Sequence, residues 1–264
     1  MTQTLNYKAE AAAGYDAAFA EVTRYFTPYL LHAAGITRGM QVLDIATGTG
    51  LVAEAALAEV GSGGSVNAAD ISPAMVRQAR LRLARSDNVA IAVENGEELS
   101  FLDQSFDAVL CSLGLMFFPS PERGLAEFHR VLRPRGRAAV SVNTVPERSY
   151  NTRINLAIAR YMPSLAEAAA RVFSLGNETR LRSLFAAAGF QDVEIATHRK
   201  AFTLPSFDAY FTSFEQGAGS PGQAFVSLPE AARRAVREEV RLDLGDAGGP
   251  IEVEVEYMFA SGRR

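Results

Sequence analysis

The chain is organised around one stretch, Val42-Leu43-Asp44-Ile45-Ala46-Thr47-Gly48-Thr49-Gly50-Leu51-Val52-Ala53. An apolar run leads into two glycines and then into a helical pattern, so we expect a buried strand, a tight turn and a helix. Exposed amides at such a helix start favour electron-rich oxygens. The spacing Gly48-x-Gly50-x-x-Ala53 also fits a dinucleotide fingerprint, with Asp70 as the acid that would bind a ribose. The glycine pattern alone therefore leaves the ligand open.

Outward from this stretch, short apolar runs alternate with helical stretches. The runs are residues 41–46, 65–70, 89–93, 106–112 and 137–142, and the alternation predicts a mostly parallel α/β sheet with helices on both faces. Ser72-Pro73 and Ser120-Pro121 predict helix starts just after strands, at the sheet edge where such folds bind ligands. Two more strands are expected at 193–197 and 251–259. The second alternates apolar residues with glutamates, which indicates a solvated, antiparallel or edge position.

Three segments do not follow this alternation of strands and helices. Residues 1–38 are Ala-rich and predict an N-terminal helical segment before a main domain at 39–264. Residues 143–175 and 199–250 follow strands in the carboxyl half. We expect both to form a cap over the ligand-binding edge of the sheet.

Composition sets limits on function. The 264 residues are 48% hydrophobic with a net charge of −4, which is typical of a globular protein and disfavours nucleic acid as a partner. One cysteine and three histidines give no basis for a disulfide or a thiolate zinc site, so we expect no metal. No basic run followed by an apolar stretch opens the chain, and the longest apolar run, 109–118, is too short to span a bilayer. We expect a cytoplasmic protein without a membrane partner, and the residues leave open whether it forms a homodimer.

Two carboxylates separate the possible ligands of the glycine loop. Asp44 precedes the glycines, where it would repel a pyrophosphate but suit a ligand with an ammonium and a sulfonium group. Asp70 ends the next strand, where it can accept hydrogen bonds from both ribose hydroxyls. Together they favour S-adenosylmethionine over NAD. An NAD(P)-dependent oxidoreductase and a non-catalytic protein that only binds the cofactor remain the alternatives.

At these residues the sequence resembles the class I S-adenosylmethionine-dependent methyltransferases, most of all those similar to the ubiquinone/menaquinone C-methyltransferases and other small-molecule methyltransferases. The resemblance rests on ordered motifs at 42–50, 70–75, 96–101, 105–109, 114–119 and 130–137. It implies a Rossmann-like sheet of seven strands, the last antiparallel. It also implies S-adenosylmethionine as cofactor and S-adenosylhomocysteine as product. Two residues depart from the family pattern: Asn95 replaces an aspartate, and Arg135 replaces a glycine.

The resemblance also implies which residues bind the cofactor. The glycine loop would hold the methionine part, and Asp70 the ribose. Ile71 and Met75 would flank the adenine, and aromatic side chains of the N-terminal helix would either close over the cofactor or merely pack that helix. The full expected set is Tyr15, Phe19, Asp44, Ala46, Thr47, Gly48, Gly50, Asp70, Ile71, Met75, Asn95, Gly96, Glu97, Cys111, Ser112 and Leu113.

The methyl acceptor is less well defined by the residues. We expect a small, fairly apolar molecule methylated on oxygen, with carbon and nitrogen left open. Side chains that would either wall its pocket or pack the core and cap are Met116, Phe117, Phe207, Tyr210 and Phe211. No general base stands out. Of the three histidines, His198 is the best candidate because it ends a strand on the ligand-binding side.

Overall fold

The computed structural model describes residues 7–264, apart from the side chains of residues 168 and 169. In this part of the chain seven strands form one sheet, in the order β3-β2-β1-β4-β5-β7-β6. Strand β7 is antiparallel to both β5 and β6, and the other neighbouring pairs are parallel. The strands are β1 (Gln41–Ile45), β2 (Ser65–Asp70), β3 (Val89–Val93), β4 (Phe106–Ser112), β5 (Leu132–Asn143), β6 (Gln191–Leu204) and β7 (Ile251–Arg263). This confirms the expected sheet with its last strand antiparallel.

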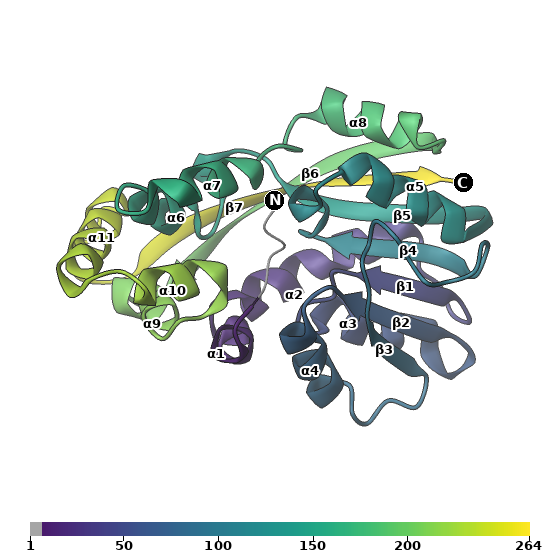
Figure 1. Cartoon of the computed structure of the whole chain (residues 1–264), viewed down its shortest axis with the longest axis horizontal. Coiled ribbons are helices and arrows are strands. Elements are labelled where there is room, and N and C mark those ends of the chain that lie inside the picture. Colours follow the sequence, from purple (N-terminus) through teal and green to yellow (C-terminus); the bar gives the residue numbers. More distant parts are fainter. Residues whose placement is uncertain (1–6) are drawn as a thin grey trace.

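Helices cover both faces of the sheet, as the alternation predicts (Figure 1). On one face α2 (Tyr15–Ala34) and α3 (Leu51–Val60) pack over Val42 and Leu110, and α4 (Pro73–Arg82) packs against β2 and β3. On the other, α5 (Pro121–Val131) and α8 (Glu178–Ala187) pack over Leu43 and Val140. Neighbouring residues of one strand therefore belong to different cores, because side chains alternate between the faces of a sheet.

The N-terminal segment is helical in the described residues, with α1 (Ala9–Ala13) preceding α2. Residues 1–6 of the predicted segment lie outside the described part of the chain. Helix α2 ends at Gly35, whose φ of 65° suits a left-handed helix cap. In residues 7–264, no helix has both the length and the apolar character needed to span a membrane.

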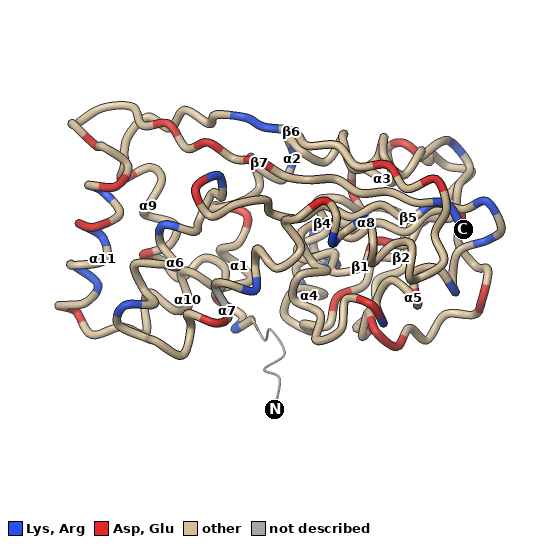
Figure 2. Tube along the Cα trace, turned by 90° about the horizontal axis from the view of Figure 1, so that it is seen from above, with Lys and Arg blue, Asp and Glu red and all other residues tan. Residues whose placement is uncertain are grey.

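The two predicted cap segments form a helical lobe at one end of the molecule, around the projecting ends of β6 and β7 (Figure 1). Acidic and basic residues are interspersed along its outer helix, α11 (Figure 2). The other helices of this lobe are α6 (Thr152–Ala159), α7 (Ala166–Arg171), α9 (Phe207–Glu215) and α10 (Gly219–Val226), and α11 spans Glu230–Asp243.

Two sequence-based expectations need correction here. Residues 199–204, assigned to the cap, continue β6, because Phe202 and Leu204 pair with Val253 and Ile251 of β7. Of the positions expected for β7, the antiparallel one is confirmed, whereas the edge position is wrong because β7 is paired on both sides and β6 forms that edge of the sheet. The glutamates of β7 are also not all exposed to solvent. Glu256 is only 9% exposed and accepts hydrogen bonds from Thr144 Oγ1 at 2.8 Å and Arg148 Nη1 at 2.9 Å.

Phe26 provides a test of how α2 is attached to the sheet. The ring is 3% exposed and lies 4.4 Å from the Tyr257 ring, centroid to centroid. We expect Phe26→Ala to lower the free energy of unfolding by about 3–5 kcal/mol, the usual cost of a large core truncation. Tyr161→Ala, at a 46% exposed aromatic residue, should cost about 0.5 kcal/mol or less. Urea unfolding followed by circular dichroism measures both, and equal losses would contradict this packing.

Candidate functional site

The glycine loop follows β1 along the carboxyl edge of the sheet. Ala46, Gly48 and Gly50 all have positive φ, at 56°, 56° and 86°, so the chain turns sharply there. The two glycines differ in their surroundings. A Cβ added to Gly50 would lie 3.3 Å from Ala79 of α4, whereas one added to Gly48 would meet nothing within 4 Å. Gly50 thus allows close packing of the loop on α4, and Gly48 leaves the backbone open to a ligand.

Asp70 holds this loop against the start of α4. Its Oδ2 accepts a hydrogen bond from the Gly48 amide, and its Oδ1 accepts one from the Ser72 amide, both at 2.9 Å. Burial raises the pKa of Asp70, and the two amides oppose that shift. Each carboxylate oxygen keeps a second lone pair. Asp70 can therefore anchor the loop and still accept the two hydroxyls of a ribose.

Asp44 lies at the end of β1 with no exposed surface. Its Oδ2 accepts a hydrogen bond from Thr47 Oγ1 at 2.6 Å, whereas no group among the described residues has hydrogen-bond geometry to its Oδ1. Burial, the largest cause, raises the pKa of this carboxyl to about 7. A buried carboxylate oxygen without a donor is costly, and a cationic donor is the group that best satisfies it. The ammonium group of S-adenosylmethionine fits this oxygen, and its ribose fits Asp70.

Aromatic residues of the N-terminal helices lie over this region. Tyr15 packs with Tyr7, Ala12, Ala74 and Met75 in one small cluster. Phe19, one turn further along α2, has its ring 4.7 Å from that of Tyr15. Burial and the nearby Asp70 raise the pKa of Tyr15 to about 12, so its hydroxyl stays neutral. The structure therefore brings Tyr15, Phe19 and Met75 together near Asp70, while Ile71 is 42% exposed.

Three residues of the expected cofactor set, Cys111, Ser112 and Leu113, lie at the carboxyl end of β4. Cys111 is fully buried in the core beneath α5, and burial raises its pKa, so it is a neutral thiol at physiological pH. Ser112 lies 3.2 Å from Ser141, oxygen to oxygen, and the Leu113 amide donates to Ser141 Oγ at 3.2 Å. Ser141 on β5 was not predicted. It lies at the same edge only because β4 and β5 pair in register there.

Three more residues of the expected cofactor set, Asn95, Gly96 and Glu97, lie in the segment between β3 and β4. Asn95 is exposed, and its Oδ1 accepts a hydrogen bond from the Glu97 amide at 3.1 Å. The Glu97 carboxylate accepts a hydrogen bond from the Ser120 amide at the start of α5. Gly96 is buried against the Phe118 ring, where a Cβ would collide. The side chain of Glu97 is thus already engaged with α5.

The predicted acceptor residues fall into two groups. Met116 is buried in the core beneath α5, with Phe117 packed against it, and Phe207 stacks on Phe211 at 5.2 Å inside the cap. Tyr210, also in α9, donates a hydrogen bond from its hydroxyl to the carbonyl of Tyr150 at 2.5 Å.

The sequence analysis missed Tyr150, whose ring lies 6.2 Å from Phe19. The ring of Phe214 also lies near Phe19, at 5.7 Å. Their positions depend on the cap folding back over α2. A tyrosine soon after the end of β5 is the only signal that could have indicated Tyr150.

His198 lies apart from these residues. Its ring stacks on Tyr29 of α2 with centroids 3.9 Å apart. Strand β6 is four positions from β1 in the sheet, which corresponds to about 19 Å at the usual spacing of neighbouring strands. The structure therefore does not bring His198 to the glycine loop.

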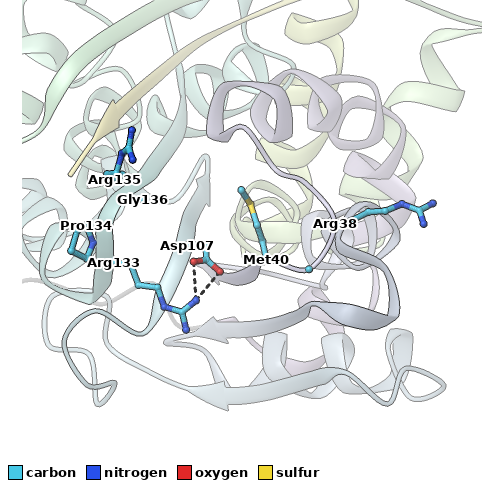
Figure 3. Close-up of a pocket in the computed structure, with 8 residues that line it drawn as sticks. Arg38, Met40, Asp107, Arg133, Pro134, Arg135 and Gly136 are labelled. Carbon is cyan, nitrogen blue, oxygen red and sulfur yellow. Dashed lines mark hydrogen bonds and ion pairs between the residues drawn. The ribbon is translucent and has the colours of Figure 1, made fainter.

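A pocket of about 380 Å³ lies at the opposite, amino edge of the sheet (Figure 3). It is lined by Arg38, Gly39, Met40, Asp107, Arg133, Pro134, Arg135 and Gly136. Inside it Asp107 accepts hydrogen bonds from Arg133 at 2.8 and 2.9 Å and from the Gln41 amide at 2.8 Å. Asp107 thus joins the starts of β1, β4 and β5, which is a structural role.

Sequence comparisons place these features in a family. A family model described as a methyltransferase domain matches residues 43–140. An uncharacterised protein of Mycobacterium tuberculosis is 32% identical over 230 residues, which are 83% of this chain and 80% of that protein. A demethylmenaquinone methyltransferase of Clavibacter sepedonicus is 37% identical over 169 residues, 59% of this chain and 67% of the relative. A ubiquinone/menaquinone biosynthesis C-methyltransferase of Idiomarina loihiensis is 30% identical over 188 residues, 66% and 75% of the two chains.

Solved structures share the fold at low sequence identity. Phosphoethanolamine N-methyltransferase 2 of Haemonchus contortus, in complex with phosphomonomethylethanolamine and S-adenosylhomocysteine, has a TM-score of 0.65 and 18% identity, covering 98% of this chain and 58% of its own. The cyclase SpnF has a TM-score of 0.57 and 16% identity, covering 95% and 83%. One fold thus hosts different reactions, and the family assignment rests on the sequence relatives. They confirm the resemblance and do not favour an oxidoreductase or a non-catalytic binding protein. The chain belongs to the class I S-adenosylmethionine-dependent methyltransferases and is an enzyme that uses this cofactor.

Proposed function

We propose that this enzyme methylates a small, uncharged, fairly apolar molecule on an oxygen atom. The observation that carries the proposal is the group of aromatic rings beside the glycine loop. Phe19 lies 4.7 Å from Tyr15, 6.2 Å from Tyr150 and 5.7 Å from Phe214, centroid to centroid. These rings come from α2, from the segment after β5 and from α9. A planar, apolar acceptor suits such surroundings, because aromatic rings pack well in offset or edge-to-face contacts.

The electrostatics of this group favour a neutral acceptor. Burial raises the pKa of both Tyr15 and Tyr150 to about 12, so their hydroxyls act as neutral hydrogen-bond groups. The nearby carboxylates, Asp44 and Asp70, are assigned to the cofactor in this proposal. Neither is therefore left to balance a charge on the acceptor. A charged acceptor would lose its hydration among the rings without a matching partner. A phenol or another aromatic alcohol carries no charge and would lose much less hydration there.

The residues around the glycine loop would hold the cofactor. Asp44 would bind the ammonium and Asp70 the ribose, while Tyr15 and Met75 would cover the nucleoside. S-adenosylmethionine supplies a methyl group already activated by its positive sulfur. The chain has to align the acceptor oxygen with that methyl group and exclude water. The acceptor proton would pass to a weak base or to a single water held at the acceptor oxygen, while bulk water stays excluded, so no histidine base is needed beside the aromatic group.

Methylation of a ring carbon is the second candidate. It is favoured by the relatives named as demethylmenaquinone methyltransferase and as ubiquinone/menaquinone biosynthesis C-methyltransferase. The same aromatic surroundings would suit a quinol ring. Carbon is the weaker nucleophile, so methylation on carbon would depend more on deprotonation of the ring hydroxyl than methylation on oxygen does.

A cytoplasmic location belongs to the same proposal. Cys111 is a free, buried thiol. Free thiols persist in reducing compartments such as the cytoplasm.

Asp44 offers the sharpest test of the cofactor assignment. In Asp44→Asn we expect the affinity for S-adenosylhomocysteine at about pH 8 to fall by roughly 10- to 100-fold, because a charge-assisted contact to the ammonium is lost. We expect the melting temperature not to fall, because the variant no longer buries an unpaired carboxylate oxygen. Calorimetry and thermal unfolding measure the two effects.

The pH dependence of binding follows from the pKa of about 7 for Asp44. Below that pH the carboxyl is protonated and cannot balance the ammonium, so wild-type affinity should rise between about pH 6 and pH 8. The Asn variant should show no such rise. Asp103→Asn, at an exposed residue, is the control and should bind like wild type. Unchanged binding by Asp44→Asn would remove Asp44 from the cofactor site.

The acceptor class can be tested with a substrate panel. We expect methyl transfer to neutral phenols and hydroquinones and little transfer to carboxylates, phosphate esters or quaternary ammonium compounds. Mass spectrometry detects the product, and NMR distinguishes an O-methyl from a C-methyl group. A C-methyl product would select the second candidate. Preference for a charged acceptor would refute the proposed class.

A further inference from the structure

Three side chains join the glycine loop to the N-terminal helices. Thr49 lies between Gly48 and Gly50 and is 4% exposed. Its hydroxyl donates to Asp16 Oδ1 at 2.6 Å. Arg82 donates through Nη2 to Asp16 Oδ2 and through Nε to the Thr49 carbonyl at 2.8 Å. We refer to Thr49, Asp16 and Arg82 together as the latch.

The latch connects three elements that surround Asp70. Asp16 is in the first turn of α2, and Arg82 is the last residue of α4. Tyr15, the neighbour of Asp16, packs with Ala12 of α1 and Met75 of α4. Releasing Asp16 would therefore remove the side-chain hydrogen bonds that tie the start of α2 to the glycine loop and α4, and leave the apolar packing of Tyr15 and Ala12 on Met75.

The burial of the carboxylates assigned to the cofactor is consistent with such a movement. Asp70 is 9% exposed, Met75 is 2% exposed, and Asp44 has no exposed surface. A ligand with an amino acid at one end and a nucleoside at the other cannot reach both carboxylates while Tyr15 and α1 lie over this region. Helix α1 has only five residues, and so short a helix has little stability of its own. Its position depends on contacts with its neighbours, and the latch supplies the charged ones.

We propose that the latch residues are positioning residues that hold α1 and the start of α2 over the cofactor, and so set how fast S-adenosylhomocysteine leaves. They act through Tyr15 and the glycine loop rather than by touching the reacting atoms. This inference uses the cofactor of the family and does not depend on which acceptor the enzyme methylates.

The surroundings of the latch indicate that its effect should depend on salt, and they provide a control variant. A second pocket of about 380 Å³, lined by Asp16, Thr49, Glu54, Gln78, Leu81 and Arg82, opens beside it. The ion pair is thus within reach of dissolved salt, which screens such pairs. Glu54 of α3 also binds Arg82, at 3.2 Å. Because it touches the same arginine without holding α2, Glu54→Gln is the matched control.

The test removes one hydroxyl. Thr49→Val keeps the size and shape of the side chain but cannot donate to Asp16. We expect S-adenosylhomocysteine to dissociate about ten-fold faster, the order expected for loss of a hydrogen bond to a charged acceptor. Thr49→Ser should restore the wild-type rate, and Glu54→Gln should leave it unchanged. Surface plasmon resonance at two salt concentrations measures these rates, and salt should speed dissociation from wild type more than from Asp16→Asn.

A second readout needs no ligand. Hydrogen exchange of the free protein should become faster in residues 9–20 of Thr49→Val and Asp16→Asn, with exchange in β1 and β4 unchanged. Wild-type dissociation rates in both variants would overturn the proposal. Faster exchange throughout the sheet would also overturn it, because the latch would then stabilise the whole fold rather than position α1 and α2.

Discussion

An unpaired carboxylate oxygen at the end of β1 is the constraint on which the rest of the site depends. Asp44 is fully buried, and its Oδ1 has no hydrogen-bond partner within residues 7–264. A buried group in this state costs about 1–3 kcal/mol or more, so the fold must hold it in place by other means. Thr47 fixes one oxygen, and the loop that carries Thr47 is itself held by Asp70. In the proposed binding mode, the ammonium group of the cofactor would pair with this oxygen.

The two halves of the molecule contribute differently to this site. The carboxyl edge of the sheet supplies rigid groups, because β1, β2 and β4 are paired on both sides. The cover comes from α1, the start of α2 and the cap, which is carried on the extended hairpin of β6 and β7 (Figure 1). A continuous row of aromatic rings from Tyr7 through Tyr15, Phe19 and Tyr150 to Tyr210 connects the two parts. Asp44 and Asp70, the carboxylates proposed to bind the cofactor, are therefore held rigidly by the sheet. The side chains proposed to exclude water instead pack on separate helices.

Local sequence patterns were enough to predict the sheet, the glycine loop and the positions of Asp44 and Asp70. They could not predict features that depend on pairing between distant segments. Residues 199–204 begin with two basic residues, Arg199 and Lys200, which interrupt the apolar pattern, yet they continue β6 because β7 lies beside them. Tyr150 was missed for a similar reason, since its contacts with Phe19 and Tyr210 span distant parts of the chain. The end of a strand suggested His198 as a base, but strand order, which the sequence does not reveal, separates it from β1.

The central claim is that Asp44 binds the ammonium group of the cofactor, and NMR of the Asp44 carboxyl carbon tests it directly. In the free protein the carboxyl should titrate near pH 7. Saturating S-adenosylhomocysteine should lower this pKa by more than about one unit, because a neighbouring positive charge favours the ionised form. An unchanged pKa in the saturated protein would show that the ammonium group binds elsewhere and would contradict the account.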